Sequence, residues 1–233
     1  MNNADRLRYF AQRSNTLHQR YLENSNLLVR YERFVTWQRE YMLPHFEELR
    51  ENNKWRPAID FIVSDLAGIG ISDRDQQIQR VIPAIIRLLP AKALQAIASG
   101  MEMNARILEI NLSICEVYVK QYGEASEFTE NKYCHAAREA VTLEECLELI
   151  TLTKSLGQDL ERIVKIPFIG ITLKSMRIPA RLAGFADLQL FLEDGYTAFT
   201  KLDNVATFLD SVEANMRLLF ERIYTTPLTE LQH

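Results

Sequence analysis

The sequence predicts an all-α fold: a single-domain bundle of about 8–10 helices around a central apolar helix near residues 101–122. Apolar residues recur at helical spacing along most of the 233-residue chain, and strict alternation of apolar and polar residues never lasts long enough to indicate a strand. Only 8 Gly and 7 Pro interrupt this pattern. The hydrophobic share of 47% and the charged share of 25% are typical of globular proteins. We therefore expect one folded domain over residues 1–233, with a frayed tail at 225–233.

Expected helix boundaries follow from capping residues, prolines and the spacing of apolar side chains. From Tyr31 onward the apolar positions step by three, four or seven residues, which places them on one side of a helix that Pro44 should kink. Thr142 and Glu145 form a capping box at one helix start, and Asp203 can cap the last helix. The expected helices cover residues 4–22, 27–50, 57–67, 73–88, 91–121, 130–140, 143–156, 167–177, 180–201 and 204–224.

The stretch from 105 to 122 has apolar side chains on two sides. One stripe contains Ile107, Ile110, Ile114 and Val117, and the other contains Leu108, Leu112, Cys115 and Val119. Because such a helix is apolar around most of its circumference, it should lie at the centre of the bundle.

Asp194-Gly195 would indicate a hairpin if strands flanked it. The apolar positions Leu188, Leu192 and Tyr196 instead pass through the pair at helical spacing. We therefore predict a helix in which Gly195 marks a close contact with another helix, at a cost of ~1 kcal/mol in helix propensity.

Composition indicates the cellular compartment and excludes some classes of partner. The net charge of −4 and the acidic isoelectric point provide no general attraction for nucleic acid, so no nucleic-acid partner is expected. The three cysteines are odd in number and form no CxxC pair, which indicates neither a disulfide framework nor a thiolate zinc site. The polar start MNNADRLRYF and the absence of about 20 consecutive apolar residues predict a cytoplasmic protein without a signal peptide or membrane span.

Motifs for metal or nucleophile chemistry are weak. The one Glu-x-x-His pair, Glu230 with His233, lies at the expected frayed end, so no metal and no cofactor are expected. Cys134 and His135 are adjacent and would point about 100° apart on a helix, which favours a small buried Cys beside a surface His. The sequence Gly68-Ile69-Gly70 lacks the third glycine of a phosphate loop and indicates a helix end and turn.

A charged turn follows that glycine pair. In Ser72-Asp73-Arg74-Asp75 the acidic side chains and the next helix start suit a capping group, which is the favoured interpretation. Alternatively, Arg74 and Arg80 face a groove and hold an anionic ligand, because guanidinium groups pair well with carboxylate and phosphate.

The segment 162–181 is basic and contains no acidic residue. Residues 121–161, by contrast, hold 9 acidic side chains against 3 basic ones. Apolar residues such as Phe168 and Ile171 are interleaved with the cations; the favoured interpretation buries them in the core and leaves the cations at helix ends. The alternative is that the segment lies on an anionic membrane surface. Its cations are Arg162, Lys165, Lys174, Arg177 and Arg181.

Two stretches resemble the bacterial FFLEELY motif protein family. Residues 56–90 read RPAIDFIVSDLAGIGISDRDQQIQRVIPAIIRLLP, and residues 175–199 read SMRIPARLAGFADLQLFLEDGYTAF. The naming motif would fall on residues 61–67, where Phe61 and Leu66 match, Asp65 keeps an acid, and Ser64 and Ala67 differ. The resemblance would cover most of the chain and implies a proteobacterial protein without an established activity, in which Asp65 can serve as the motif's acidic side chain.

These observations favour a non-catalytic helical protein whose groove or basic face binds a partner protein or a small anionic or apolar ligand. An enzyme with dispersed Asp, Arg and Tyr residues is the second hypothesis, and a pocket joining Asp60, Asp65 or Glu193 to arginines would favour it. Peripheral membrane association through 162–181 is the third. The first two helices have amphipathic faces that suit either the core or a homodimer. The candidate ligand-binding residues are Asp65, Arg74, Arg80, Lys174, Arg177 and Arg181.

Overall fold

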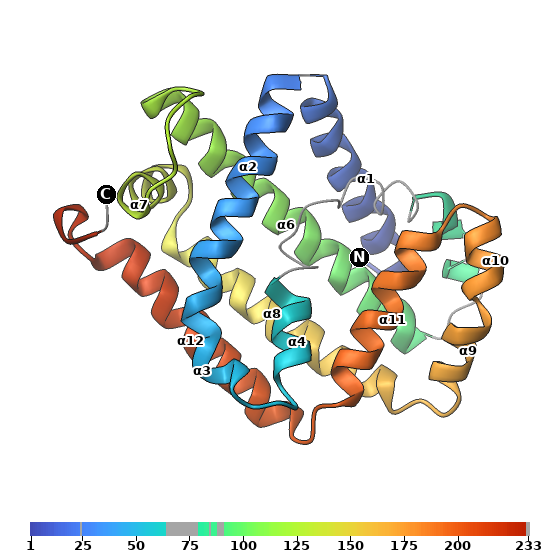
Figure 1. The fold of residues 1–233 in the computed structure, drawn as a ribbon. Coiled ribbons are helices and arrows are strands. Elements are labelled where there is room, and N and C mark those ends of the chain that lie inside the picture. The colour runs from blue at the N-terminus through green and yellow to red at the C-terminus, as the bar shows by residue number, and fades with distance from the viewer. Residues whose placement is uncertain (24, 64–78, 84, 88–90, 232–233) are drawn as a thin grey trace.

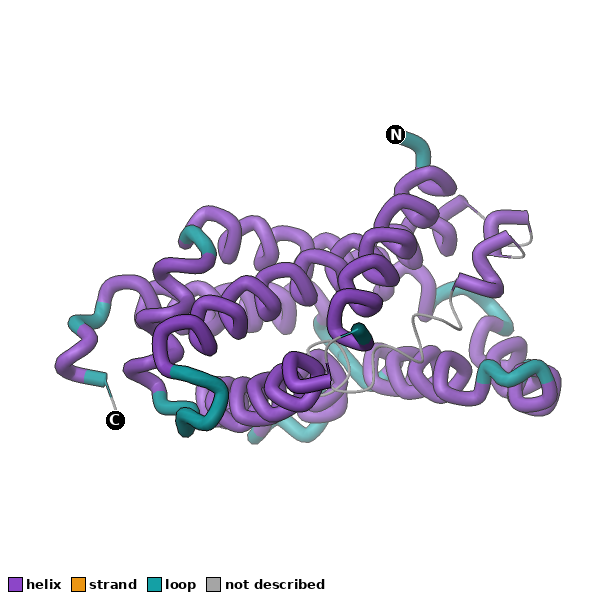
Figure 2. The backbone as a smooth tube through the Cα atoms, turned by 90° about the horizontal axis from the view of Figure 1, so that it is seen from above, coloured by secondary structure: helices purple, strands orange, loops and turns teal. Residues whose placement is uncertain are grey.

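The computed structural model describes the chain except residues 24, 64–78, 84, 88–90 and 232–233. Within the described residues, helices and short connections make up the whole fold and no strand occurs, which confirms the predicted all-α bundle (Figures 1 and 2).

The first half of the chain forms two long helices and several short ones. Asn2 caps the first helix by accepting a hydrogen bond from the Asp5 amide at 2.9 Å. The predicted kink at Pro44 is confirmed, because the residues around it form a single 3₁₀ turn between two α-helices. The elements are α1 (Asn3–Leu22), α2 (Ser25–Met42), η1 (Leu43–Phe46), α3 (Glu47–Arg50) and α4 (Arg56–Phe61).

The second half begins with the longest described helix. The capping box of Thr142 and Glu145 is confirmed, with the Glu145 amide donating to the Thr142 hydroxyl at 3.2 Å. The elements are α6 (Ala91–Tyr122), α7 (Glu130–Ala140), α8 (Leu143–Val164), α9 (Ile169–Ser175), α10 (Arg177–Leu182), α11 (Ala186–Thr200), α12 (Val205–Thr225) and η3 (Leu228–Glu230).

Helix α6 occupies the predicted central position. It contacts α1, α2, α7 and α8, and it crosses the middle of the molecule in Figure 1. Leu108, Leu112, Ile114 and Cys115 from its two apolar stripes are all buried. The helix begins at Ala91, well before the start of the predicted central segment at 101.

Two predicted helix ends are wrong, and glycines explain both. Helix α8 continues past 156 to Val164, with Gly157 inside it. A side chain at Gly157 would overlap Leu209, so the glycine marks a close approach of α8 to α12 and not a helix end. The break before α11 lies near Gly184, whose φ of 78° ends α10, and not at the expected residues 178–179.

The N-cap of the last helix is also corrected. Asn204, and not Asp203, caps α12 by accepting a hydrogen bond from the Thr207 amide at 3.1 Å. Asp203 instead pairs with Lys54 at 2.8 Å. Adjacent residues that can both cap a helix are distinguished only by the path of the chain entering it.

The predicted close contact at Gly195 is confirmed. A Cβ built on Gly195 would lie 2.9 Å from Cζ of Phe61, so α4 packs directly on the backbone of α11. The C-terminal stretch expected to fray includes Leu231, whose side chain is 3% exposed and packs in the main core.

No helix among the described residues is long and apolar enough to cross a membrane.

Candidate functional site

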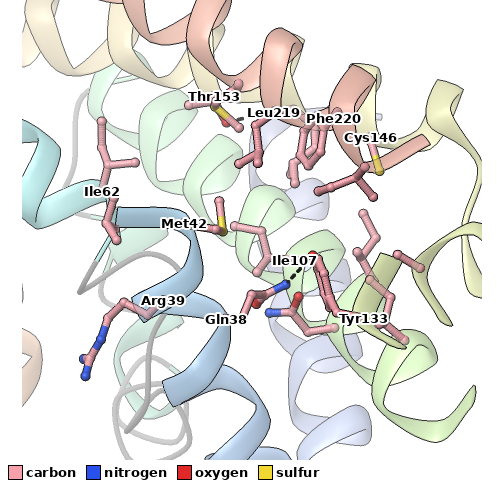
Figure 3. A pocket seen from close by; sticks show the side chains of 18 of the residues that line it. Gln38, Arg39, Met42, Ile62, Ile107, Tyr133, Cys146, Thr153, Leu219 and Phe220 are labelled. Atoms are coloured by element: carbon pink, nitrogen blue, oxygen red, sulfur yellow. Dashed lines mark hydrogen bonds between the residues drawn. The ribbon is translucent and has the colours of Figure 1, made fainter. Parts of the chain in front are cut away.

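A partly open cavity lies where five helices meet. Its volume is about 90 Å³, and side chains from α2, α6, α7, α8 and α12 point into it (Figure 3). Most of the described lining is apolar: Met42, Phe46, Ile62, Val63, Met103, Ile107, Ile110, Ile114, Ala137, Leu149, Met216, Leu219, Phe220 and Ile223. The lining favours an apolar occupant.

Only a few polar groups reach this cavity. The buried Gln38 amide donates to the Tyr133 hydroxyl at 3.1 Å, which places one hydrogen-bonding pair at its wall (Figure 3). Thr153 donates to the Leu149 carbonyl within its own helix at 2.9 Å and is thereby satisfied. Among the described lining residues Arg39 alone is charged, and its guanidinium points away from the Gln38–Tyr133 pair.

The tyrosine hydroxyls and the cysteine thiol of the lining are held neutral. Burial raises the pKa of the Tyr133 hydroxyl and of the Tyr224 hydroxyl above that of a free tyrosine. Burial likewise raises the pKa of the Cys146 thiol. At neutral pH these groups carry no charge, so the cavity is suited to a neutral molecule and offers no thiolate nucleophile.

The predicted ligand-binding residues lie elsewhere. Asp65 and Arg74 fall outside the described residues, together with the glycine pair at 68–70 and the charged turn at 72–75. Arg80 is exposed in the helical stretch 79–83. Ile82 in the same stretch belongs to the α1–α6 cluster, a buried apolar group that also contains Leu7, Phe10, Ala11, Ala98, Met101 and Ala105. No described contact joins Arg80 to the α9–α10 cations, and none of the described candidates lines the cavity.

Three candidates do come together on α9 and α10. Lys174, Arg177 and Arg181 all lie on this short helical segment, and all three are exposed. The favoured expectation that the apolar residues between them lie in the core is wrong for Phe168 and Ile171, which are exposed. The segment runs along the edge of the molecule and packs mainly on α11, so only one of its sides can be buried.

Of the acids proposed for an enzyme site, the two described ones, Asp60 and Glu193, form ion pairs. Asp60 accepts a hydrogen bond from Arg50 at 2.8 Å. Hydrogen bonds from Arg177 and then Gln189 lower the pKa of Glu193 to about 2, the opposite of the shift expected for a general acid. Neither carboxylate lines the cavity. The geometry therefore lends no support to an Asp/Arg catalytic site at these positions.

The Arg177–Glu193 pair predicts a pH-dependent attachment of α10 to α11. A carboxylate whose pKa falls from 4.5 to about 2 on folding stabilises the folded state above pH 4.5, and this contribution is lost as the pH falls toward 2. Glu193→Gln should therefore speed hydrogen exchange of the α10 amides at neutral pH, and its difference from the wild type should shrink in acid. Glu221→Gln, at an exposed acid of α12, is the control. An E193Q difference that does not change with pH would contradict this assignment.

The Cys134–His135 pair matches the favoured interpretation of a buried cysteine beside a surface histidine. The Cys134 side chain is fully buried, whereas His135 is exposed and shares a hydrogen bond with the Tyr122 hydroxyl. In the part of the chain that the structure describes, no group of three or more His, Cys, Asp or Glu side chains is arranged to hold a metal ion.

The cavity residues were not identified from the sequence. One signal was available: Ile107, Ile110 and Ile114 form the second apolar stripe of α6, and a second stripe requires a second neighbour. Spacing alone does not reveal whether that neighbour fills the space completely.

Comparison with known families matches residues 17–228 to the family described as a domain of unknown function, DUF8198. The curated proteins and the solved structures contain no match to the chain. The family match does not extend to the FFLEELY motif family, so that resemblance stays a prediction.

Proposed function

The chain belongs to the DUF8198 family of domains of unknown function, and from its interior geometry we propose that it is a non-catalytic binding protein for a small, neutral, apolar molecule. The observation that carries this proposal is the apolar cavity of about 90 Å³ among α2, α6, α7, α8 and α12. Well-packed interiors contain few voids larger than a water molecule, so a space of this size at the meeting point of five helices is a natural binding site.

The chemistry of the lining specifies the ligand class. A charged ligand would lose its hydration without gaining a partner, because the tyrosines and the cysteine of the lining are neutral and the Arg39 guanidinium points away from the Gln38–Tyr133 pair. The Tyr133 hydroxyl accepts from Gln38 and can still donate one hydrogen bond, so a ligand with a single carbonyl or ether oxygen is accommodated. The ligand is therefore mainly apolar, with an acceptor atom for the Tyr133 hydroxyl.

Size restricts the ligand further. An apolar cavity of roughly 150 Å³ in another protein stays dry and takes up benzene or xenon. At about 90 Å³ this cavity suits a smaller molecule, on the scale of a short hydrocarbon chain or one xenon atom. Molecules the size of typical cofactors exceed this space.

Xenon is the probe that tests the cavity. Under xenon pressure the methyl signals of Ile107, Ile114 and Ile223 should shift in carbon–proton spectra, whereas that of Ile85, in the α1–α6 cluster, should not. Solvent extraction of protein purified without denaturation, followed by gas chromatography and mass spectrometry, should release a small neutral compound. Failure of both the shift and the extraction would overturn the proposal.

A variant that fills the cavity tests whether xenon binds there. Cys146→Leu adds side-chain volume at the lining and should abolish the xenon shifts while the protein stays folded. Cys134→Ala changes a buried cysteine outside the lining and should keep them. Unchanged xenon shifts in C146L would place the bound gas elsewhere.

A further inference from the structure

An exposed apolar stripe runs along the outside of α9 and α10. The side chains of Phe168, Ile178 and Leu182 are 76%, 73% and 84% exposed, and Ile171 and Met176 are also exposed. Single exposed apolar residues are normal on protein surfaces, but five within residues 168–182 form a patch that marks an interaction surface.

Contacts with α11 fix which side of this segment faces outward. The Leu173 carbonyl accepts a hydrogen bond from Gln189 at 2.6 Å, and Arg177 Nε donates to both carboxylate oxygens of Glu193 at 2.7 Å. Ala180 is buried on the same side. These three positions step by four and three residues, so they share one face of the helical segment and hold it on α11.

The outward-facing residues are also spaced so that they share one face of the helical segment. Ile171, Ile178 and Leu182 step by seven and four residues, which places them on one common face, and all three are exposed. The chain enters the segment through Phe168, whose φ of 66° is the one positive value of a non-glycine residue in the described chain. Its exposed ring lies at the end of the apolar stripe.

Charges within residues 162–186 are all of one sign. No acidic residue occurs from 162 to 186, and Lys174 and Arg181 are exposed without an ion pair in the described part of the chain. The other cations pair with acids outside this stretch: Arg162 with Asp159, Lys165 with Glu161, and Arg177 with Glu193. The stripe is therefore apolar with a positive flank.

We propose that this face docks onto an anionic lipid membrane surface. The apolar side chains would enter the boundary between headgroups and acyl chains, while Lys174 and Arg181 lie among the anionic headgroups. Figure 1 shows α9 and α10 at an edge of the molecule, where they can meet a flat surface. A second copy is a poorer occupant, since a two-fold contact between identical faces sets cation against cation. The face shares no residue with the cavity and goes beyond the proposed function.

Vesicle flotation tests the proposal directly. Vesicles of phosphatidylcholine with about one-third phosphatidylserine should carry the full-length protein upward at low salt. Vesicles of phosphatidylcholine alone should carry far less, and salt at about 0.5 M should weaken the binding by screening the charges. The probe is the vesicle itself, so a free phosphorylated molecule cannot produce the signal.

Two sets of variants separate the apolar part from the cationic part. Lys174→Gln with Arg181→Gln should reduce binding roughly fivefold for each cation removed. Ile178→Ser with Leu182→Ser should abolish it. Leu218→Ser with Lys120→Gln changes an exposed apolar residue and an exposed cation on other helices, and it should leave binding unchanged.

These changes lie on the surface, and far-ultraviolet circular dichroism verifies that each variant folds. The proposal is overturned if the wild type does not float with anionic vesicles at low salt, or if it floats and the four site changes have no effect. Sedimentation that shows a dimer lost in I178S/L182S, without flotation, would assign the face to a second copy.

Discussion

Phe208→Ala is expected to lower the free energy of unfolding by about 3–5 kcal/mol. The Phe208 ring is fully buried on α12, with the rings of Trp55 and Phe199 at centroid distances of 5.7 and 6.5 Å. Trp55 lies just before α4 and Phe199 lies on α11, so these neighbours cannot collapse together to refill the space. The loss therefore includes both the transfer of the ring to water and the cavity that it leaves. Urea unfolding followed by circular dichroism measures it.

Leu218→Ala is the matched control on the same helix. Its side chain is 64% exposed, so truncation should change the free energy of unfolding by no more than about 0.5 kcal/mol. The contrast tests the orientation of α12. Similar losses for the two variants would show that Phe208 does not face the core.

Gly195→Ala and Gly100→Ala are expected to differ in stability by about 1–3 kcal/mol. Both glycines lie inside helices, where alanine gains ~1 kcal/mol of helix propensity. At Gly100 the added Cβ meets only Leu156 Cδ1 at 3.9 Å, an ordinary contact, so the gain remains. At Gly195 it would lie 2.9 Å from the buried ring of Phe61 and force α4 away from α11.

A double-mutant cycle identifies the cause. Phe61→Leu removes the ring atoms that meet the new methyl group, so Gly195→Ala should cost less in that background than in the wild type. Thermal or urea unfolding of the four proteins measures the coupling. Additive losses would mean that the cost at Gly195 does not come from the α4–α11 contact.

Much of the architecture could be predicted because its determinants are local. Apolar spacing identified the helical class and the central position of α6, since a helix that is apolar on two sides must be covered on two sides. The Thr142–Glu145 box and the turn at Pro44 depend on residues close together in the chain. The close contact at Gly195 could also be predicted. The helical spacing of apolar residues continues through this glycine, so its presence there requires a reason other than a helix end.

The site and the exposed face were decided by tertiary structure alone. Ile107 faces a space that depends on how closely five helices approach one another, and no spacing in the sequence encodes that distance. Ile171 and Ile178 have the spacing of core residues, yet they are exposed because α9 and α10 have one principal neighbour. Periodicity determines which side chains share a face of a helix, whereas burial of that face requires a second surface that only the packed chain provides.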